Sequence, residues 1–242
     1  MGGKIDCYLD LASVYSYLTF LELQKNRDLL ASHNVEIEFH PVLLGAINAG
    51  SGNKPPWTLP AKATYGTFDA RRSIARHAPL EVAFPADLFQ AGKTQVPLRV
   101  LHHLKTSHPT AFLPTLHFFF HTFWSPPNPD LTTPAAVAAA LASMPRNFTG
   151  AGTGEGRMFT DEQIKAIVEA AGGAEMKDVL KKVTGEALGR GAFGAPWLWV
   201  TNGEGQGEPF FGSDRFHFVW EHLGLPYNDV TLLPAGAVRS KL

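Results

Sequence analysis

The sequence has a single cysteine, Cys7, among its 242 residues. One cysteine excludes an internal disulfide and fits a reducing compartment. It lies within an alternating apolar pattern, where a buried and inert thiol is expected rather than a nucleophile. Disulfide oxidoreductases need a Cys-x-x-Cys pair, so thiol–disulfide exchange by the chain itself is excluded.

The sequence also lacks an excess of one charge and any long hydrophobic run. It carries 21 basic and 22 acidic residues, for a net charge of −1 and a pI near 6.8. This balance leaves no electrostatic footprint for nucleic acid, and no basic amphipathic stretch suggests a membrane surface. The aromatic cluster at residues 118–120 is far too short to cross a bilayer. The first residues run almost at once into a strand pattern, so we expect no signal peptide.

The most informative stretch covers residues 5–18. Residues 5 to 9 alternate between apolar and polar, as in a half-buried strand, and from Val14 onward apolar side chains recur at the spacing of one helix face. Ser13 therefore lies at or just before the first turn of a helix. Free backbone N–H groups and the positive end of the helix dipole favour an anion there, such as a thiolate or carboxylate. The alternative is that Ser13 is only a helix N-cap, a common role for serine.

A second strand and a helical block follow. Residues 35–39 alternate strictly and predict a strand with its odd-numbered residues toward the core. Because a helix connects it to the first strand, the two should be parallel with a right-handed crossover. Residues 48–56, rich in glycine and proline, predict a loop. From residue 57 to about 188 the pattern is helical throughout. The expected helices cover 65–77, 94–105, 114–124, a segment after Thr133, 160–171 and 176–183.

Strand signals return near the C-terminus. Pro196 opens a short buried strand that ends near residue 201, Asn202-Gly203 predicts a hairpin turn, and residues 208–211 form the returning strand. Ser213 and Asp214 should cap a last helix.

The order β-α-β, a helical block, then β-β-α predicts an α/β fold. It is that of a thioredoxin-like domain interrupted by a large all-helical insertion. The expected boundaries are 1–56 and 189–227 for the discontinuous thioredoxin-like domain, 57–188 for the insertion and 228–242 for a C-terminal tail.

Four motifs carry a resemblance to a known family: residues 10–16, 51–56, 191–196 and 211–215. In their order and spacing they resemble the kappa-class glutathione transferases and the related 2-hydroxychromene-2-carboxylate isomerases, from about residue 5 to residue 224. The resemblance implies that Asn53, Ala195 and Pro196 hold glutathione, Ala195 through its backbone before a proline that is typically cis. It also implies that Ser213 and Asp214 bind the carboxylate and ammonium of the γ-glutamyl end.

The same resemblance makes Ser13 the catalytic serine, whose hydroxyl donates a hydrogen bond to the glutathione sulfur. A thiol of pKa about 8.5 is mostly protonated at neutral pH, and a hydroxyl donor at a helix N-terminus could lower that value by roughly two units. Glutathione is then the cosubstrate, and no permanently bound cofactor is expected. Val14 stands where the family commonly has proline, and Ala195 where its residue is often larger. Neither departure removes a reacting group.

We therefore predict a kappa-type glutathione transferase that conjugates or reduces small hydrophobic electrophiles, and the resemblance implies a homodimer. One alternative is an isomerase that uses glutathione as a transient nucleophile. The other is a glutathione-binding protein with little turnover, which Val14 leaves open.

Two further signals concern metal and location. His117 and His121 would share a helix face, but two histidines fall short of the three or four ligands that zinc needs, so we predict no metal site.

The last three residues, Ser240, Lys241 and Leu242, match the peroxisomal address Ser-Lys-Leu. They predict a peroxisomal protein whose partner is the import receptor.

Overall fold

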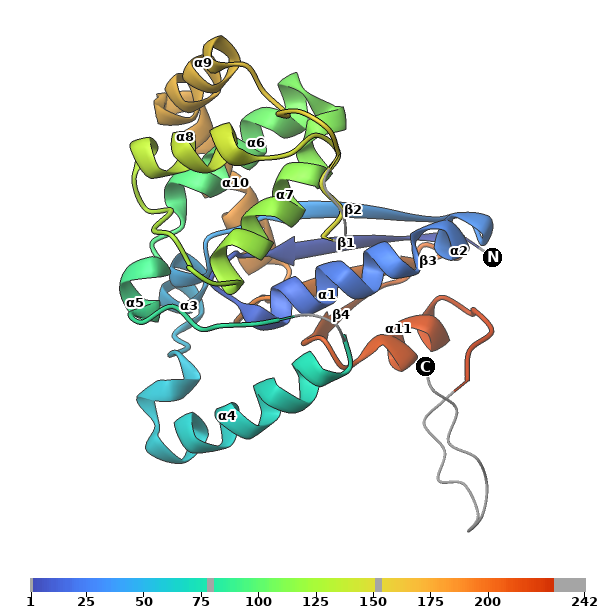
Figure 1. Cartoon of the computed structure of the whole chain (residues 1–242). Coiled ribbons are helices and arrows are strands. Elements are labelled where there is room, and N and C mark those ends of the chain that lie inside the picture. The colour runs from blue at the N-terminus through green and yellow to red at the C-terminus, as the bar shows by residue number, and fades with distance from the viewer. Residues whose placement is uncertain (1, 78–80, 151–153, 229–242) are drawn as a thin grey trace, which may run out of the picture.

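The computed structural model describes residues 2–77, 81–150 and 154–228. Its centre is one four-stranded sheet in the order β2-β1-β3-β4 (Figure 1). The strands are β1 (Gly3–Leu9), β2 (Val35–Pro41), β3 (Trp197–Asn202) and β4 (Gly207–Phe211). β1 pairs in parallel with β2 and antiparallel with β3, and β3 pairs antiparallel with β4. The predicted strands and their order are confirmed.

Helices occupy most of the remaining chain. Two of them, α1 (Val14–Lys25) and α2 (Arg27–Ser32), connect the parallel pair β1 and β2. The last, α11 (Phe216–His222), follows β4. Between β2 and β3 lie α3 (Leu44–Ser51), the short 3-10 helix η1 (Pro56–Thr58), α4 (Pro60–Ala75), α5 (Leu88–Ala91), α6 (Gln95–Ser107), α7 (Pro109–Trp124), α8 (Pro134–Ser143), α9 (Asp161–Gly172) and α10 (Ala174–Gly189).

The two faces of the sheet bury different sets of side chains. Ile5, Cys7 and Leu9 point into a large apolar core that also receives side chains from α1, α6, α7, α8 and α9. Tyr8 and Trp197 point to the other face, where they join a smaller cluster with side chains of α3 and α10. The helical block and the sheet thus share one continuous core, although α4 lies apart from α6–α9 (Figure 1). The domain boundaries drawn from the sequence stay a prediction.

Several helix starts follow local capping rules. Thr133 accepts a hydrogen bond from the Ala136 amide before the proline that opens α8. Thr160 and Gln163 form the predicted capping box of α9. Both predicted helix starts are confirmed. They could be predicted because each capping pattern lies within four residues of sequence.

Other boundaries were wrong because tertiary packing overrode local signals. α3 continues to Ser51, well into the stretch predicted as a loop, and ends at Gly52 with a φ of 74°. Its last turn packs on α10: a Cβ at Gly50 would meet the Leu188 side chain at 2.7 Å, so a glycine is needed for this approach.

Two helices begin earlier than predicted, each at a proline in the first turn. α4 starts at Pro60 and α7 at Pro109, although Pro114 lies inside α7. Proline fits the first helical position because that N–H has no partner within the helix. Ala111 and Phe112 are buried in the core, and their packing holds the first turn of α7 in place despite Pro114.

The predicted cap of the last helix was also wrong. α11 begins after Arg215, which makes no side-chain capping hydrogen bond. The Asp214 carboxylate instead accepts a hydrogen bond from the Arg215 guanidinium at 2.7 Å. Ser213 and Asp214 therefore belong to the turn between β4 and α11.

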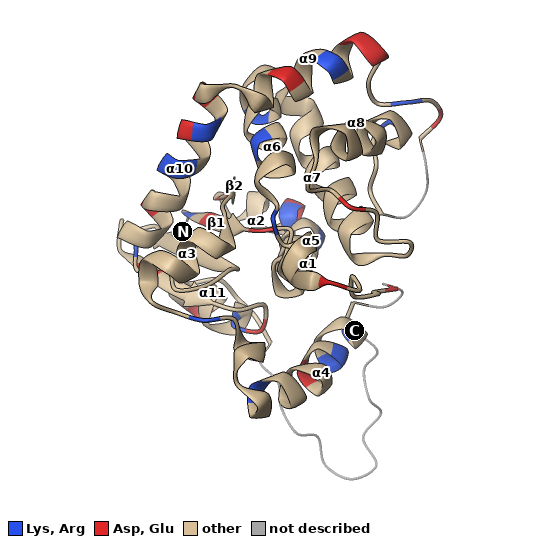
Figure 2. Cartoon of the chain, turned by 90° about the vertical axis from the view of Figure 1, so that its left-hand side faces the viewer, with Lys and Arg blue, Asp and Glu red and all other residues tan. Residues whose placement is uncertain are grey.

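Surface charge is mixed, as the composition predicts. Figure 2 shows basic and acidic residues alternating along α4, α9 and α10, without a face of one sign. Within the described ranges, none of the helices combines the length and apolar character that a bilayer crossing requires.

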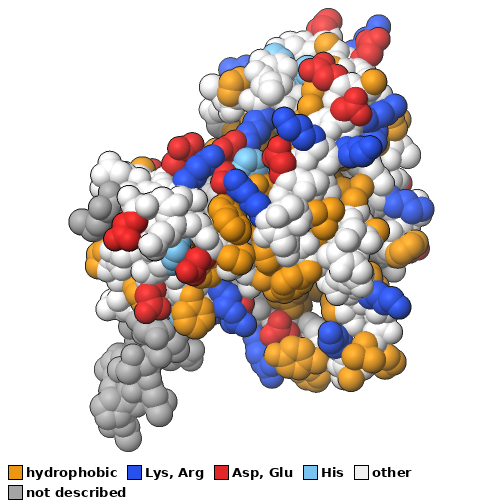
Figure 3. Space-filling view, turned by 180° about the vertical axis from the view of Figure 1, so that it is seen from behind, with side chains coloured by type: hydrophobic (Ala, Val, Ile, Leu, Met, Phe, Trp, Pro, Cys, Tyr) orange, Lys and Arg blue, Asp and Glu red, His pale blue; other side chains and the backbone are white. Residues whose placement is uncertain are grey.

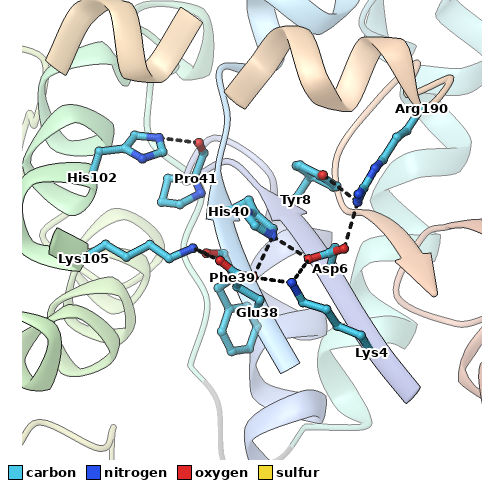
Figure 4. Close-up of polar contacts among 10 residues, drawn as sticks. All are labelled: Lys4, Asp6, Tyr8, Glu38, Phe39, His40, Pro41, His102, Lys105 and Arg190. Atoms are coloured by element: carbon cyan, nitrogen blue, oxygen red, sulfur yellow. Dashed lines mark hydrogen bonds and ion pairs between the residues drawn. The ribbon is translucent and has the colours of Figure 1, made fainter. Parts of the chain in front are cut away.

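An ion-pair network fastens β1 to β2 on the α10 side of the sheet (Figure 4). Asp6 receives the Lys4 ammonium at 3.0 Å, His40 Nε2 at 2.9 Å and the Arg190 guanidinium at 2.9 Å. Glu38 on β2 pairs with Lys4 and with Lys105 of α6. Burial alone would raise the pKa of Asp6, but the bonds from His40, Arg190 and Lys4 outweigh it and hold that pKa well below its usual range.

We predict that Asp6→Asn lowers the free energy of unfolding by about 2 kcal/mol at pH 7, because it removes a buried carboxylate that pairs with the partly exposed Lys4 and Arg190 and accepts from His40. A carboxylate with a depressed folded-state pKa contributes stability above its unfolded pKa and loses it as pH falls below about 4. The difference between wild type and variant, measured by urea unfolding, should therefore shrink at pH 3.

The matched control is Asp161→Asn, which breaks an exposed pair with Arg157. It should cost about 0.5 kcal/mol or less at either pH. Equal losses in the two variants would show that the Asp6 network adds nothing beyond a surface pair.

Candidate active site

Ser13 lies at the junction of β1 and α1, in extended backbone with φ −110° and ψ 114°. Its hydroxyl oxygen accepts a hydrogen bond from the Ser16 amide at 3.2 Å, so Ser13 is the N-cap of α1. The residue is only 7% exposed. Ser13 therefore caps α1 through its hydroxyl oxygen. The hydroxyl proton takes no part in this cap and is donated elsewhere.

The Ser13 hydroxyl proton is directed at the turn before β3. The Ser13 hydroxyl donates to the backbone carbonyl of Ala195 at 2.9 Å, across 182 positions of sequence. The Ala195–Pro196 peptide bond is cis. The structure thus brings together the junction before α1 and the turn before β3.

Asn53 lies beside the same turn. Its side-chain amide donates to the carbonyl of Phe193 at 2.7 Å, and its position follows from the end of α3 at Gly52. Asn53 is exposed, and its hydrogen bond to Phe193 holds it beside the turn that leads to Ala195 and Pro196.

Ser213 and Asp214 line a neighbouring cavity of about 420 Å³. Its other walls come from α1, α4 and α11, including Glu22, Arg72 and Arg76. No hydrogen bond links this pair to Ser13 among the described residues. Ser13 and Ala195 are therefore in direct contact, whereas Ser213 and Asp214 line a separate cavity.

Tyr15, two residues after Ser13, contacts α4, the helix that lines the cavity with Ser213 and Asp214. Its hydroxyl donates to Asp69 of α4 at 2.7 Å, and the Tyr65 hydroxyl donates to the other oxygen of Asp69 at 3.2 Å. Burial, then the Asp69 carboxylate, and more weakly Asp214, raise the pKa of the Tyr15 hydroxyl. Tyr15 was not predicted as a site residue, because no local pattern in the sequence reveals a partner 54 positions away.

Exposed aromatic rings flank the turn before Pro196. Phe193 and Phe211 are each 42% exposed, and their ring centroids lie 4.6 Å apart. A Cβ at Gly194 would meet the Phe211 ring at 2.8 Å, so only glycine allows this ring to lie on the turn. By contrast, the aromatic cluster at residues 118–120 is buried in the core and does not form a wall of the site.

The described carboxylates that could hold a metal already form ion pairs. Asp6, Glu38 and His40 are the described group whose ligand atoms lie within 4.8 Å of one another. Both carboxylates already bind lysine or arginine side chains, so this cluster is an ion-pair network rather than a cation site. His117 lies among aromatic rings of the core, and burial lowers its pKa to about 4.

The single thiol is inert in this fold. Cys7 is fully buried on β1, and burial, followed by the charge of Asp6, raises its pKa. Ser13 and Ser16 stand at the helix N-terminus where an oxidoreductase of this topology would carry its cysteine pair. The site can therefore orient a thiol that a ligand brings, but it has none of its own.

Comparison with known proteins agrees with this geometry. The sequence profile of the DsbA-like thioredoxin domain matches residues 4–224. The chain belongs to the DsbA-like thioredoxin domain family.

Within that family the chain is similar to kappa-class glutathione transferases. It is 28% identical to glutathione S-transferase kappa 1 of Homo sapiens over 91% of this chain and 90% of that protein. It is 29% identical to glutathione S-transferase kappa 1 of Caenorhabditis elegans, over 92% of each. Among solved structures, a 2-hydroxychromene-2-carboxylate isomerase superimposes with a TM-score of 0.66 and 20% identity, covering 91% of this chain and 94% of that one. This last likeness supports the fold.

Proposed function

We propose that this protein is a glutathione transferase of the kappa type, which activates the glutathione thiol for conjugation to, or reduction of, small hydrophobic electrophiles. The observation that carries the proposal is the Ser13 hydroxyl, held at the N-terminus of α1 and directed at the backbone before a cis-proline. The similarity to kappa-class enzymes along nine-tenths of the chain supports it.

The proposed reaction requires the Ser13 hydroxyl to change its hydrogen-bond acceptor. The Ser13 hydroxyl donates a hydrogen bond to the Ala195 carbonyl. In this proposal a peptide-like ligand donates its own N–H to that carbonyl, and the Ser13 hydroxyl rotates so that it donates to the ligand sulfur. The thiol proton passes to solvent, and the hydroxyl and the positive end of α1 stabilise the thiolate that remains. In conjugation the thiolate sulfur bonds to the electrophilic carbon, and the leaving group departs with the electron pair of the broken bond. Ser13 acts as a hydrogen-bond donor and does not form a covalent bond.

The remaining predicted residues fit the ends of glutathione. Asn53 and the backbone of Ala195 and Pro196 line one side of the bound tripeptide in this proposal. Ser213 and Asp214 bind the γ-glutamyl carboxylate and ammonium, because a hydroxyl with a free amide suits the first and a carboxylate the second. Arg72, in the same cavity, supplies a cation near that carboxylate.

The test is a thiol titration of bound glutathione, following thiolate absorbance against pH in the wild type and in Ser13→Ala. We expect a bound thiol pKa roughly two units below 8.5 in the wild type, rising toward the free value in the variant. The rise follows from losing the Ser13 hydroxyl, which donates to the sulfur in this proposal.

The control is Thr133→Ala, which removes an N-cap of the same kind from α8, away from the site. Its bound thiol should titrate like that of the wild type. If bound glutathione keeps an unshifted thiol in the wild type, Ser13 is a helix cap only and the transferase proposal is wrong.

Two alternatives use the same binding site. A glutathione-dependent isomerase is favoured by the fold shared with 2-hydroxychromene-2-carboxylate isomerase, and analysis of products distinguishes rearranged substrate from a glutathione conjugate. A glutathione-binding protein with little turnover would bind glutathione without any rate loss in Ser13→Ala.

We also propose a homodimer, in which the surface of η1 and α4 is covered. Trp57, Leu59 and Phe68 on this segment are 46%, 51% and 50% exposed. Figure 3 shows apolar side chains gathered over this part of the molecule. Exposed apolar patches of this kind mark association surfaces. Sedimentation velocity should show a dimer, and the Phe68→Ser variant should weaken it. The control is Leu29→Ser, which changes an exposed apolar residue on α2 and should leave the dimer intact. A monomeric wild type would refute the proposal.

Finally, we propose a peroxisomal location through Ser240, Lys241 and Leu242, which lie outside the described residues. A fluorescent fusion at the N-terminus should reach peroxisomes, and removal of these three residues should leave it in the cytosol. Unchanged peroxisomal import of the truncated chain would show that another signal is used.

A further inference from the structure

Asp10 is a buried acid that the proposed chemistry does not use. It follows β1 directly, lies three residues before Ser13 and is 1% exposed. No ion pair joins it to a lysine, arginine or histidine within residues 2–77, 81–150 and 154–228. Burial raises the pKa of Asp10 to about 6, even though amide and hydroxyl hydrogen bonds oppose that rise. A carboxyl group in such a place needs a structural or functional reason.

Each polar contact of its side chain comes from a hydrogen-bond donor. One oxygen accepts from the Ala12 amide at 3.0 Å and from the Thr94 hydroxyl at 2.7 Å. The other accepts from the Leu44 amide at 2.6 Å. An ionised carboxylate is an acceptor only, so it satisfies all three donors at once. An asparagine would place an NH₂ group against one of them.

The backbone of Asp10 holds the same turn. Its carbonyl accepts from the Ser13 amide at 3.1 Å, and its amide donates to the Ser16 hydroxyl at 3.4 Å. Side chain and backbone together thus make three hydrogen bonds to the turn that carries Ser13, at Ala12, Ser13 and Ser16.

The carboxylate also joins this turn to two other elements. Leu44 is the first residue of α3, whose N-cap residue supplies no side-chain acceptor, so Asp10 caps that helix from a distance. α3 ends at Ser51, two residues before Asn53. Thr94 is the N-cap residue of α6, in the helical block. One carboxylate therefore fixes the mutual position of the Ser13 turn, the helix leading to Asn53 and the helical block.

We propose that Asp10 is the positioning residue of the thiol site, which sets the Ser13 hydroxyl and the α3 helix in their relative places. Its consequence for turnover rests on the proposed function, but its effect on the Ser13 turn does not. Asp10 touches neither the thiol nor the electrophile in this proposal and acts through the turn alone.

The first test uses the ligand-free protein. Amide hydrogen exchange, followed by NMR at Ala12, Ser13 and Leu44, is compared in the wild type, Asp10→Asn and Thr94→Val. Loss of one charge-assisted hydrogen bond should speed exchange at these amides about tenfold in Thr94→Val, and further in Asp10→Asn. Thr94→Ser keeps the hydroxyl and should restore slow exchange.

The matched control is Thr115→Val, which removes a buried hydroxyl of α7 that donates to the sulfur of Met144, the residue that follows α8. It should leave the three amides unchanged. If Thr94→Val also leaves them unchanged, Asp10 does not fix the turn, and the proposal is overturned whether or not glutathione binds.

The second test measures kcat and KM for glutathione in the Thr94 variants. We expect kcat to fall about tenfold in Thr94→Val with recovery in Thr94→Ser, together with a rise in the bound thiol pKa. Faster exchange with unchanged kcat and thiol pKa would reduce Asp10 to a structural residue and refute its role at the site. A wild type without glutathione turnover would refute the proposed function, while the exchange data still decide the role of Asp10 in the turn.

Discussion

The hydrogen bond from Ser13 to the Ala195 carbonyl holds the site together. It joins the start of α1 to the turn before β3, which come from opposite ends of the chain. Both partners lie where the sheet ends, so the strand pairing of β1 with β3 brings them within reach before any side chain acts. The bond also orients the Ser13 hydroxyl, whose residue is only 7% exposed. A hydroxyl that is already oriented and desolvated needs little reorganisation when it acts as a donor, as our proposed function requires.

Two aspartates four residues apart show how the fold controls charge. Asp6 meets ammonium, guanidinium and imidazole groups, which outweigh its burial and lower its pKa. Asp10 meets only neutral donors, and burial raises its pKa to about 6. β1 presents Asp6 to one face of the sheet with Tyr8, whereas Asp10 follows the strand and turns into the junction. The same side chain is thus an ordinary ion-pair partner in one place and a costly buried acid in the other.

Much of the fold could be read from the sequence because its signals are local. Strand alternation, the Thr133 and Thr160 caps and the hairpin at Asn202 each depend on a few adjacent residues. The errors occurred where distant packing decided the outcome: α3 extends to Ser51 because its end contacts α10, and α7 begins at Pro109 because its first turn is buried. The site shows the same division. Motif resemblance pointed to Ser13 and Ala195, but Tyr15 with Asp69 and Asp10 with Thr94 join segments more than 50 positions apart. No periodicity encodes such pairs.

The strand order has a consequence for how the chain folds as it leaves the ribosome. β1 lies in the middle of the sheet, between β2 and β3, yet β3 is made almost last. While the helical block emerges, β1 has a partner on one edge only, and its other edge offers unpaired amides and carbonyls. Contacts of such high sequence separation form slowly. A nascent chain that has not reached Asn202 therefore carries an open sheet edge, and this stage of synthesis is where the protein most needs protection from other strands.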